Sequence, residues 1–136
     1  EKVLYFVFNI IKKGVLFSLV PALILFLFSQ KLFVIIFGNK WLQAGLFAQY
    51  LSIPFFLRLI VSPLSIIFIS FEKVRIGAIW QISYFFISFI VFFFASKYDS
   101  KVFILTYALN EFVMYSLYLV LILFTINKTE RKTCAV

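Results

Sequence analysis

The chain has no histidine, one cysteine and five acidic residues among its 136 positions. It therefore lacks the commonest general base and metal ligand, and Cys134 has no second cysteine with which to form an internal disulfide. The five acids are scattered, and neither a close carboxylate pair nor a glycine-rich phosphate loop occurs. We expect a protein that is not an enzyme and that uses no cofactor or metal.

Charge is scarce as well. Charged residues make up 13% of the chain and hydrophobic residues 65%, with 21 phenylalanines and a mean hydropathy of +1.12. This composition leaves too little polar surface to cover a soluble globule, so it indicates an integral membrane protein. The net charge of +8 comes from basic residues that flank apolar stretches, and we expect contact with membrane lipid and no nucleic-acid binding.

At about 20 apolar residues per crossing, the sequence predicts an all-α, polytopic bundle of four transmembrane helices within residues 14–125. The expected spans are residues 14–30, 47–71, 76–95 and 102–125. Residues 1–13, which end in two lysines, fit either a cytoplasmic interfacial helix or the end of a further span. Residues 31–46 predict a turn on the outer face, where Gly38 permits a sharp change of direction and Trp41 suits the headgroup layer.

The distribution of basic residues predicts the orientation. Eight of them fall before the first span, between the second and third, or after the fourth: Lys2, Lys12, Lys13, Lys73, Arg75, Lys128, Arg131 and Lys132. The other connections carry four: Lys31, Lys40, Lys97 and Lys101. By the positive-inside rule, both termini are expected to be cytoplasmic, with residues 127–136 as a basic tail.

One segment resembles a known family. Phe37-Gly38-Asn39-Lys40-Trp41-Leu42-Gln43-Ala44-Gly45 is similar to the "F-G-x-x-W-x-x-A" signature of polysaccharide-unit flippases, the O-antigen and teichuronic-acid exporters of the multidrug/oligosaccharidyl-lipid/polysaccharide superfamily. Ser62-Pro63-Leu64-Ser65 before a short basic turn is also similar, as is the order of the spans. The resemblance implies part of a larger transporter bundle in the cytoplasmic membrane. It implies a polyprenyl-(pyro)phosphate-linked oligosaccharide as the substrate.

Arg58 lies near the middle of the second span, where a permanent cation costs at least about 2.5 kcal/mol. Pro54, Ser62 and Ser65 recur on the same helical face, which we expect to be wet or packed against protein. Pro54 and Pro63 each remove a backbone donor, so they predict a kink or hinge on either side of Arg58. This face fits a binding cavity, or a packed bend with Arg58 in a salt bridge.

The fourth span carries a comparable polar stripe of Tyr107, Glu111, Tyr115 and Tyr118, with Asn110 beside Glu111. Tyr107, Glu111 and Asn110 are further candidates for a cavity lining. Counted inward at about 1.5 Å per residue, Arg58 lies about 17 Å and Glu111 about 14 Å deep, so the two could form an ion pair. Alternatively, Arg58 faces an anionic substrate while Glu111 bonds neutral partners.

The third span has a polar stripe and an aromatic remainder. The stripe predicts contacts between helices, and the phenylalanines predict a surface that faces lipid. Trp80, near the cytoplasmic end, fits the aromatic belt at the membrane interface. The stripe consists of Gly77, Gln81, Tyr84 and Ser88.

The sequence leaves three functions open. The preferred one is a flippase that moves lipid-linked oligosaccharide units across the membrane for cell-surface polysaccharide synthesis, with Arg58 facing the (pyro)phosphate. The second is a drug or cation antiporter of the same superfamily, in which Glu111 responds to protons or cations. The third is a non-transporting four-helix membrane subunit.

Overall fold

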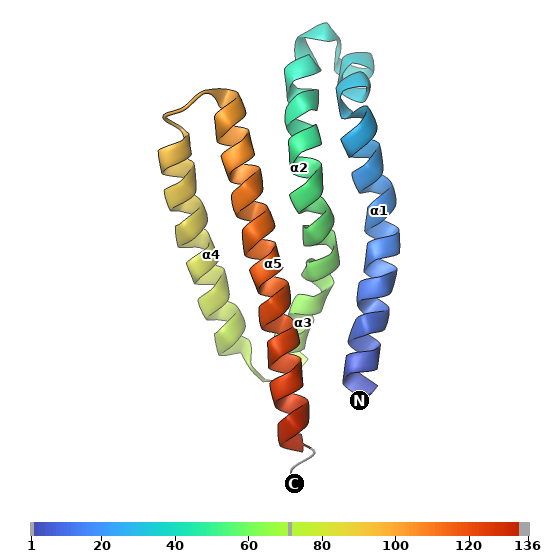
Figure 1. Ribbon diagram of the computed structural model, residues 1–136, viewed down its shortest axis with the longest axis vertical. Coiled ribbons are helices and arrows are strands. Elements are labelled where there is room, and N and C mark those ends of the chain that lie inside the picture. Colours follow the sequence, from blue (N-terminus) through green and yellow to red (C-terminus); the bar gives the residue numbers. More distant parts are fainter. Residues whose placement is uncertain (1, 71, 134–136) are drawn as a thin grey trace.

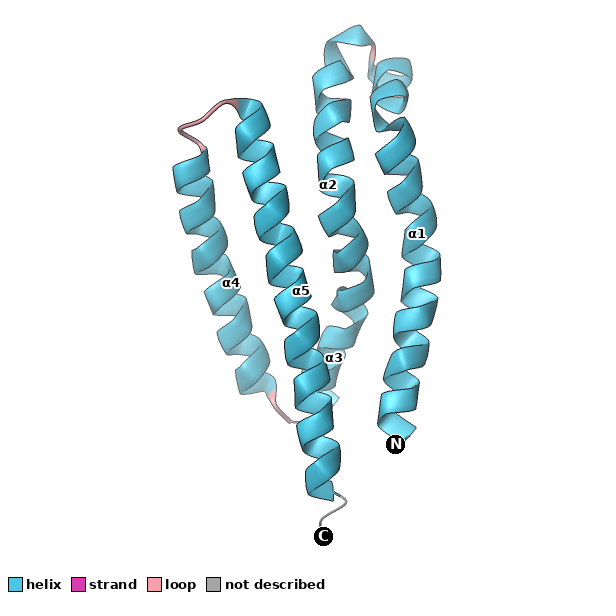
Figure 2. Ribbon diagram, in the orientation of Figure 1, coloured by secondary structure: helices cyan, strands magenta, loops and turns pink. Residues whose placement is uncertain are grey.

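The structure, a computed structural model, describes residues 2–70 and 72–133, and these form helices joined by short turns (Figure 1, Figure 2). Within these residues, four helical segments are long and apolar enough to cross a membrane. The predicted all-α class with four spanning helices is confirmed. The elements are α1 (Lys2–Phe37), η1 (Asn39–Trp41), α2 (Leu42–Val61), η2 (Ser62–Ser65), α3 (Ile66–Ser70), α4 (Val74–Ala95) and α5 (Ser100–Thr133).

The long helices stand side by side in the order α1, α2, α5, α4 (Figure 1). Helix α2 packs against both α1 and α5, and α5 packs against α4. The start of α1 and the end of α5 lie at the same end of the molecule, as the even number of predicted crossings requires. The α1–α2 and α4–α5 connections lie at the opposite end.

Helix α1 is continuous from Lys2 to Phe37, so its bounds differ from those expected. Residues 2–13 of the expected N-terminal segment belong to α1 and do not form a separate helix, and the turn expected over residues 31–46 does not begin at Lys31. Lysines can remain helical while their ammonium groups reach toward water, so Lys12, Lys13 and Lys31 do not interrupt the helix. At about 1.5 Å per residue, the helix is about 54 Å long, well beyond the roughly 30 Å hydrocarbon core.

The reversal between α1 and α2 occurs at Gly38, whose φ of 93° lies in the region that glycine adopts without strain. One 3-10 turn follows and leads into α2. Trp41 is exposed, and its ring lies 5.4 Å from the ring of Phe37. The turn is therefore shorter than predicted but uses the glycine and the tryptophan of the motif.

Helices α1 and α2 approach closely just below this turn. A Cβ at Gly45 would lie 2.6 Å from the Gln30 Cα and 2.9 Å from the Ser29 carbonyl oxygen. Gln30 Nε2 donates a hydrogen bond to Gln49 Oε1 at 2.8 Å. Ser29 is 1% exposed, and its hydroxyl has no hydrogen-bond partner among the described residues. Small residues and one amide pair thus hold this hairpin together.

The two prolines of the second span behave differently. Pro54 is buried and α2 remains an α-helix around it, whereas the helix tightens into the 3-10 segment η2 at Pro63. Proline lacks an N–H and its ring crowds the carbonyl four residues earlier, which accounts for the local change at Pro63. The expected break therefore occurs at one proline, and a hinge role for either stays a prediction. The expected span ended at Phe71, which lies outside the described residues.

Helix α4 contributes few buried side chains. Ala95 is buried, while its phenylalanines are exposed and form the aromatic surface expected to face lipid. Helix α5 continues past the predicted end of the fourth span at residue 125 as far as Thr133. The expected tail thus begins as helix, and its residues 134–136, with Cys134, lie outside the described residues.

The main cluster of buried apolar side chains lies near the end that holds the chain termini. There α1, the segment from α2 to α3, and α5 converge. The cluster packs α5 against the rest of the bundle. Its members are Val7, Val61, Leu64, Phe68, Tyr118, Ile122 and Ile126.

Candidate functional site

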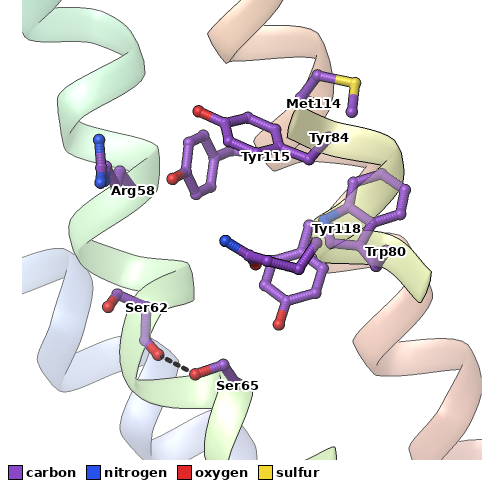
Figure 3. A pocket seen from close by; sticks show the side chains of 9 residues that line it. Arg58, Ser62, Ser65, Trp80, Tyr84, Met114, Tyr115 and Tyr118 are labelled. Atoms are coloured by element: carbon purple, nitrogen blue, oxygen red, sulfur yellow. Dashed lines mark hydrogen bonds between the residues drawn. The ribbon is translucent and has the colours of Figure 1, made fainter. Parts of the chain in front are cut away.

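Arg58 lies on α2 at the boundary between two recesses, one on each side of it along the helix axis. Its guanidinium carbon lies 5.8 Å from the centre of the Tyr115 ring on α5, a cation–π distance. The side chain is exposed, and Figure 3 shows it across from the tyrosines of α4 and α5. Arg58 therefore lines both recesses, and a role for it in binding substrate stays a prediction.

The first recess, called the Trp80 recess, lies between α2 with η2 on one side and α4 with α5 on the other (Figure 3). Its volume is about 200 Å³. It combines one cation, hydroxyl and amide groups and several aromatic rings. Its lining residues are Arg58, Ser62, Ser65, Trp80, Gln81, Tyr84, Met114, Tyr115 and Tyr118.

The second recess, called the Glu111 recess, lies between α2 and α5 and has a volume of about 180 Å³. It brings the predicted residues Pro54, Arg58, Tyr107 and Glu111 together, with Leu51 and Phe55 completing the lining. The polar stripe of the second span therefore faces these recesses. Pro54 lies in the Glu111 recess, Ser62 and Ser65 in the Trp80 recess, and Arg58 in both.

Glu111 is 4% exposed, and its carboxylate accepts a hydrogen bond from the Tyr84 hydroxyl at 2.6 Å. Next to it in sequence, Asn110 Nδ2 donates a hydrogen bond to Ser88 Oγ at 3.2 Å. Both bonds join α4 to α5 from the polar stripes predicted on the third and fourth spans. A buried carboxylate needs such donors, because an unpartnered one would cost far more than a neutral group.

Arg58 and Glu111 do not form an ion pair, since no nitrogen–oxygen distance between them is within 4 Å among the described side chains. Their connection is indirect. Arg58 faces the Tyr115 ring, whose centre lies 6.0 Å from that of Tyr84, and Tyr84 donates to Glu111. Glu111 therefore bonds a neutral partner, and an anionic substrate at Arg58 stays a prediction.

Trp80 packs inward against the Tyr118 ring, with the ring centres 5.4 Å apart and the planes 7° from parallel. The Tyr118 ring also stacks with that of Phe68, at 5.9 Å and 17°. These residues form a stack of three rings in the order Phe68, Tyr118, Trp80. The inward contact was not predicted from the sequence, and an anchoring role for Trp80 at the interface stays a prediction.

Several residues of the site were not singled out from the sequence. Tyr84, Gln81 and Tyr115 belonged to predicted polar stripes, but no stripe showed which residue meets which. No sequence pattern indicated that Met114 would line the site. Gly38 and Trp41 lie in the α1–α2 connection and outside both recesses.

The described residues contain no group of three or more histidine, cysteine, aspartate or glutamate side chains that could hold a metal ion. No protein-family model, curated protein or solved structure matches the chain. The function is therefore inferred from the geometry of the two recesses and from the motif resemblance.

Proposed function

We propose that this chain forms part of a membrane exporter that moves a lipid-linked oligosaccharide across the cytoplasmic membrane, with Arg58 facing the lipid's phosphate. The observation that carries the proposal is the setting of Arg58. It lines two recesses, of which the Trp80 recess is mainly polar, and it has no acidic partner within 4 Å among the described residues.

The electrostatics support an anionic ligand. A cation that deep in a low-dielectric region is costly unless it meets water or negative charge. The nearest candidate acid, Glu111, already accepts the Tyr84 hydrogen bond, and Arg58 meets an aromatic face instead. A phosphate or pyrophosphate group offers the charge and the paired oxygens that a guanidinium binds best.

The motif resemblance supports the oligosaccharide carrier. The bend at Gly38 and the 3-10 segment at Ser62–Ser65 fall on the two motif segments that resemble polysaccharide-unit flippases. In this proposal, the termini face the cytoplasm, because the end of the bundle that holds them carries the larger set of basic residues.

The test is export of surface polysaccharide by cells that depend on this protein. Arg58→Gln removes the charge and is expected to lower export at least tenfold at equal protein level, with Arg58→Lys retaining part of it. Arg75→Gln is the matched control, because Arg75 is an exposed arginine at the start of α4 outside both recesses. Equal export by the Arg58→Gln and Arg75→Gln variants would remove the support for the proposal.

A charge exchange separates ligand binding from ion pairing. Because Arg58 and Glu111 are not paired, the double variant Arg58→Glu with Glu111→Arg is expected to be as inactive as either single reversal. Recovery of export in the double variant would show that the two charges meet during transport, which would contradict phosphate binding by Arg58.

The buried carboxylate favours one further candidate function. Glu111 lines a recess shared with Arg58, which is a setting for a proton- or cation-responsive group in an antiporter. Loss of transport in Glu111→Gln, with Arg58→Ala tolerated, would favour that function over the exporter. An assembly defect in Arg58→Ala with export intact would instead favour a non-transporting subunit.

A further inference from the structure

The Trp80 recess contains more kinds of functional group than the binding of a phosphate requires. A phosphate would be satisfied by Arg58 and a few donors, whereas the opposite wall offers the Trp80 indole and several tyrosine rings. An acyl chain would use the rings but not the side-chain amide of Gln81 or the hydroxyls of Ser62 and Ser65. The mixture fits a ligand that has an anionic group, hydroxyls and an apolar ring face.

We propose that the Trp80 recess binds a glycosyl phosphate, with the phosphate at Arg58 and the sugar ring directly attached to it against Trp80. A pyranose ring has C–H faces that stack on aromatic rings and hydroxyls that bond amides and hydroxyls around its edge. This inference rests on the proposed function, because it assigns the Trp80 recess to the first sugar of the lipid-linked oligosaccharide, the one attached to the phosphate.

The size of the recess limits what it can hold. At about 200 Å³, it lies below the range of about 300–1,000 Å³ found for pockets that bind drug-sized ligands. It accommodates one sugar ring and its phosphate, and the remaining sugars extend beyond it. The site therefore distinguishes carriers by their first sugar.

The polar groups are available for this role. No hydrogen bond joins the side-chain amide of Gln81 to another described residue, and Gln81 is exposed on the recess. Ser65 Oγ donates to the Ser62 carbonyl oxygen at 2.8 Å, which leaves its lone pairs to accept from a sugar hydroxyl. The amide adds two donors and an acceptor.

The aromatic wall is held in place before a ligand arrives. Trp80 lies nearly parallel to Tyr118, which is itself 9% exposed and stacked on Phe68. Packing on the inner side fixes the indole without covering all of it, since Trp80 remains half-buried and lines the recess. A fixed ring gives up little conformational entropy when a sugar binds.

The experiment uses the two tryptophans of the chain, Trp41 and Trp80. In a Trp41→Phe background, Trp80 is the remaining indole and reports on the recess by its fluorescence. The protein is reconstituted in nanodiscs with radiolabelled polyprenyl phosphate or polyprenyl-phosphoryl hexose, and both retention and Trp80 emission are measured.

Both lipids are expected to bind in an Arg58-dependent way, and the hexose is expected to tighten binding about tenfold, as one stacked ring and one or two hydrogen bonds would give. Only the hexose lipid should shift Trp80 emission. Gln81→Leu should remove most of the tenfold gain, while Gln43→Leu, an exposed glutamine outside the recess, should keep it. Trp80→Phe should keep part of the gain and Trp80→Leu should lose it.

The outcomes separate the two proposals. Equal affinity for the two lipids without an emission change, while Arg58→Gln abolishes binding, would overturn the sugar site and leave the exporter proposal standing. A hexose gain that depends on Gln81 but not on Arg58 would overturn the phosphate assignment. Failure of both lipids to bind above phosphatidylglycerol would overturn both. Because Gln81 is exposed, its variant remains informative even if Trp80→Leu misfolds.

Discussion

The α1–α2 and α4–α5 contacts join neighbouring helices by different means. Between α1 and α2 the backbones nearly touch at Gly45, where a Cβ would lie 2.6 Å from the Gln30 Cα, and they are in ordinary contact at Gly14, where a Cβ would lie 3.7 Å from the Ile60 Cα. Between α4 and α5 the contact is made by side chains, through the Tyr84–Glu111 and Asn110–Ser88 hydrogen bonds. The hollow between α1 and α2 is lined almost entirely by apolar side chains, whereas the recesses beside the α4–α5 contacts contain charged and polar groups.

This difference indicates that the two helix pairs have different roles. In lipid, helices associate through van der Waals packing of small residues and through interhelical hydrogen bonds, because lipid tails are as apolar as leucine. The α1–α2 pair is held mainly by van der Waals packing of small residues and forms a fixed unit. The α4–α5 pair relies on interhelical hydrogen bonds. Its polar atoms lie next to Arg58, where a bound ligand can form hydrogen bonds with them instead.

The largest expected effect comes from adding a methyl group where the helices touch. Gly45→Ala places a Cβ 2.6 Å from backbone atoms that cannot move aside, so it should destabilise the α1–α2 pair by about 3 kcal/mol or more, the upper end of what overpacking costs. Thermal unfolding in a single detergent measures the loss. The matched control is Gly77→Ala, where the new Cβ would lie at an ordinary 3.5 Å from Phe68 and helix propensity favours alanine. Equal melting of the two variants would contradict the close backbone contact.

An intermediate effect is expected at the other pair. Tyr84→Phe removes the donor to Glu111 and leaves a buried carboxylate short of a partner, at a cost of about 1–3 kcal/mol. Glu111→Gln in the same background should recover much of this, because a neutral amide costs less to bury. The double-mutant cycle is read by unfolding, with Tyr98→Phe, on the exposed α4–α5 turn, as the control. Independent effects of the two substitutions would exclude this hydrogen bond as a tie between α4 and α5.

The smallest effect is expected at the amide pair of the α1–α2 hairpin. Gln30→Leu alone should cost about 0.6 kcal/mol, the average for a hydrogen bond between membrane helices. Gln30→Leu with Gln49→Leu should be close to neutral, because neither amide is then left without a partner. If the single variant instead melts as low as Gly45→Ala, hydrogen bonding rather than backbone contact holds the hairpin.

Much of the fold follows from the sequence because the length of an apolar run sets the number of crossings. The face of the second span that carries Pro54, Arg58, Ser62 and Ser65 also followed from helical periodicity, and all four line a recess. These features depend on one helix at a time, which is why they can be read without knowing its neighbours.

Features that depend on two helices could not be read in this way. Counting residues placed Arg58 and Glu111 at similar depth, but depth does not fix the direction in which each side chain points around its helix. The partner of Glu111 is Tyr84, and that of Arg58 is the Tyr115 ring. Gly45 gave no signal either, because a glycine marks a close approach only once the opposing backbone is known.

The apolar cluster near the termini has a consequence for how the protein resists unfolding. Val7, Phe68 and Ile126 each precede a basic residue, Lys12, Lys73 or Lys128, by no more than a turn or two. These lysines place the cluster at the level of the lipid headgroups, where water penetrates. Burial of apolar surface stabilises the fold there by about 25 cal/mol per Å². Deep in the bilayer the same burial contributes little, because the lipid tails are themselves apolar. Urea, which acts from the aqueous phase, should therefore loosen this end first and leave the Gly45 contact intact.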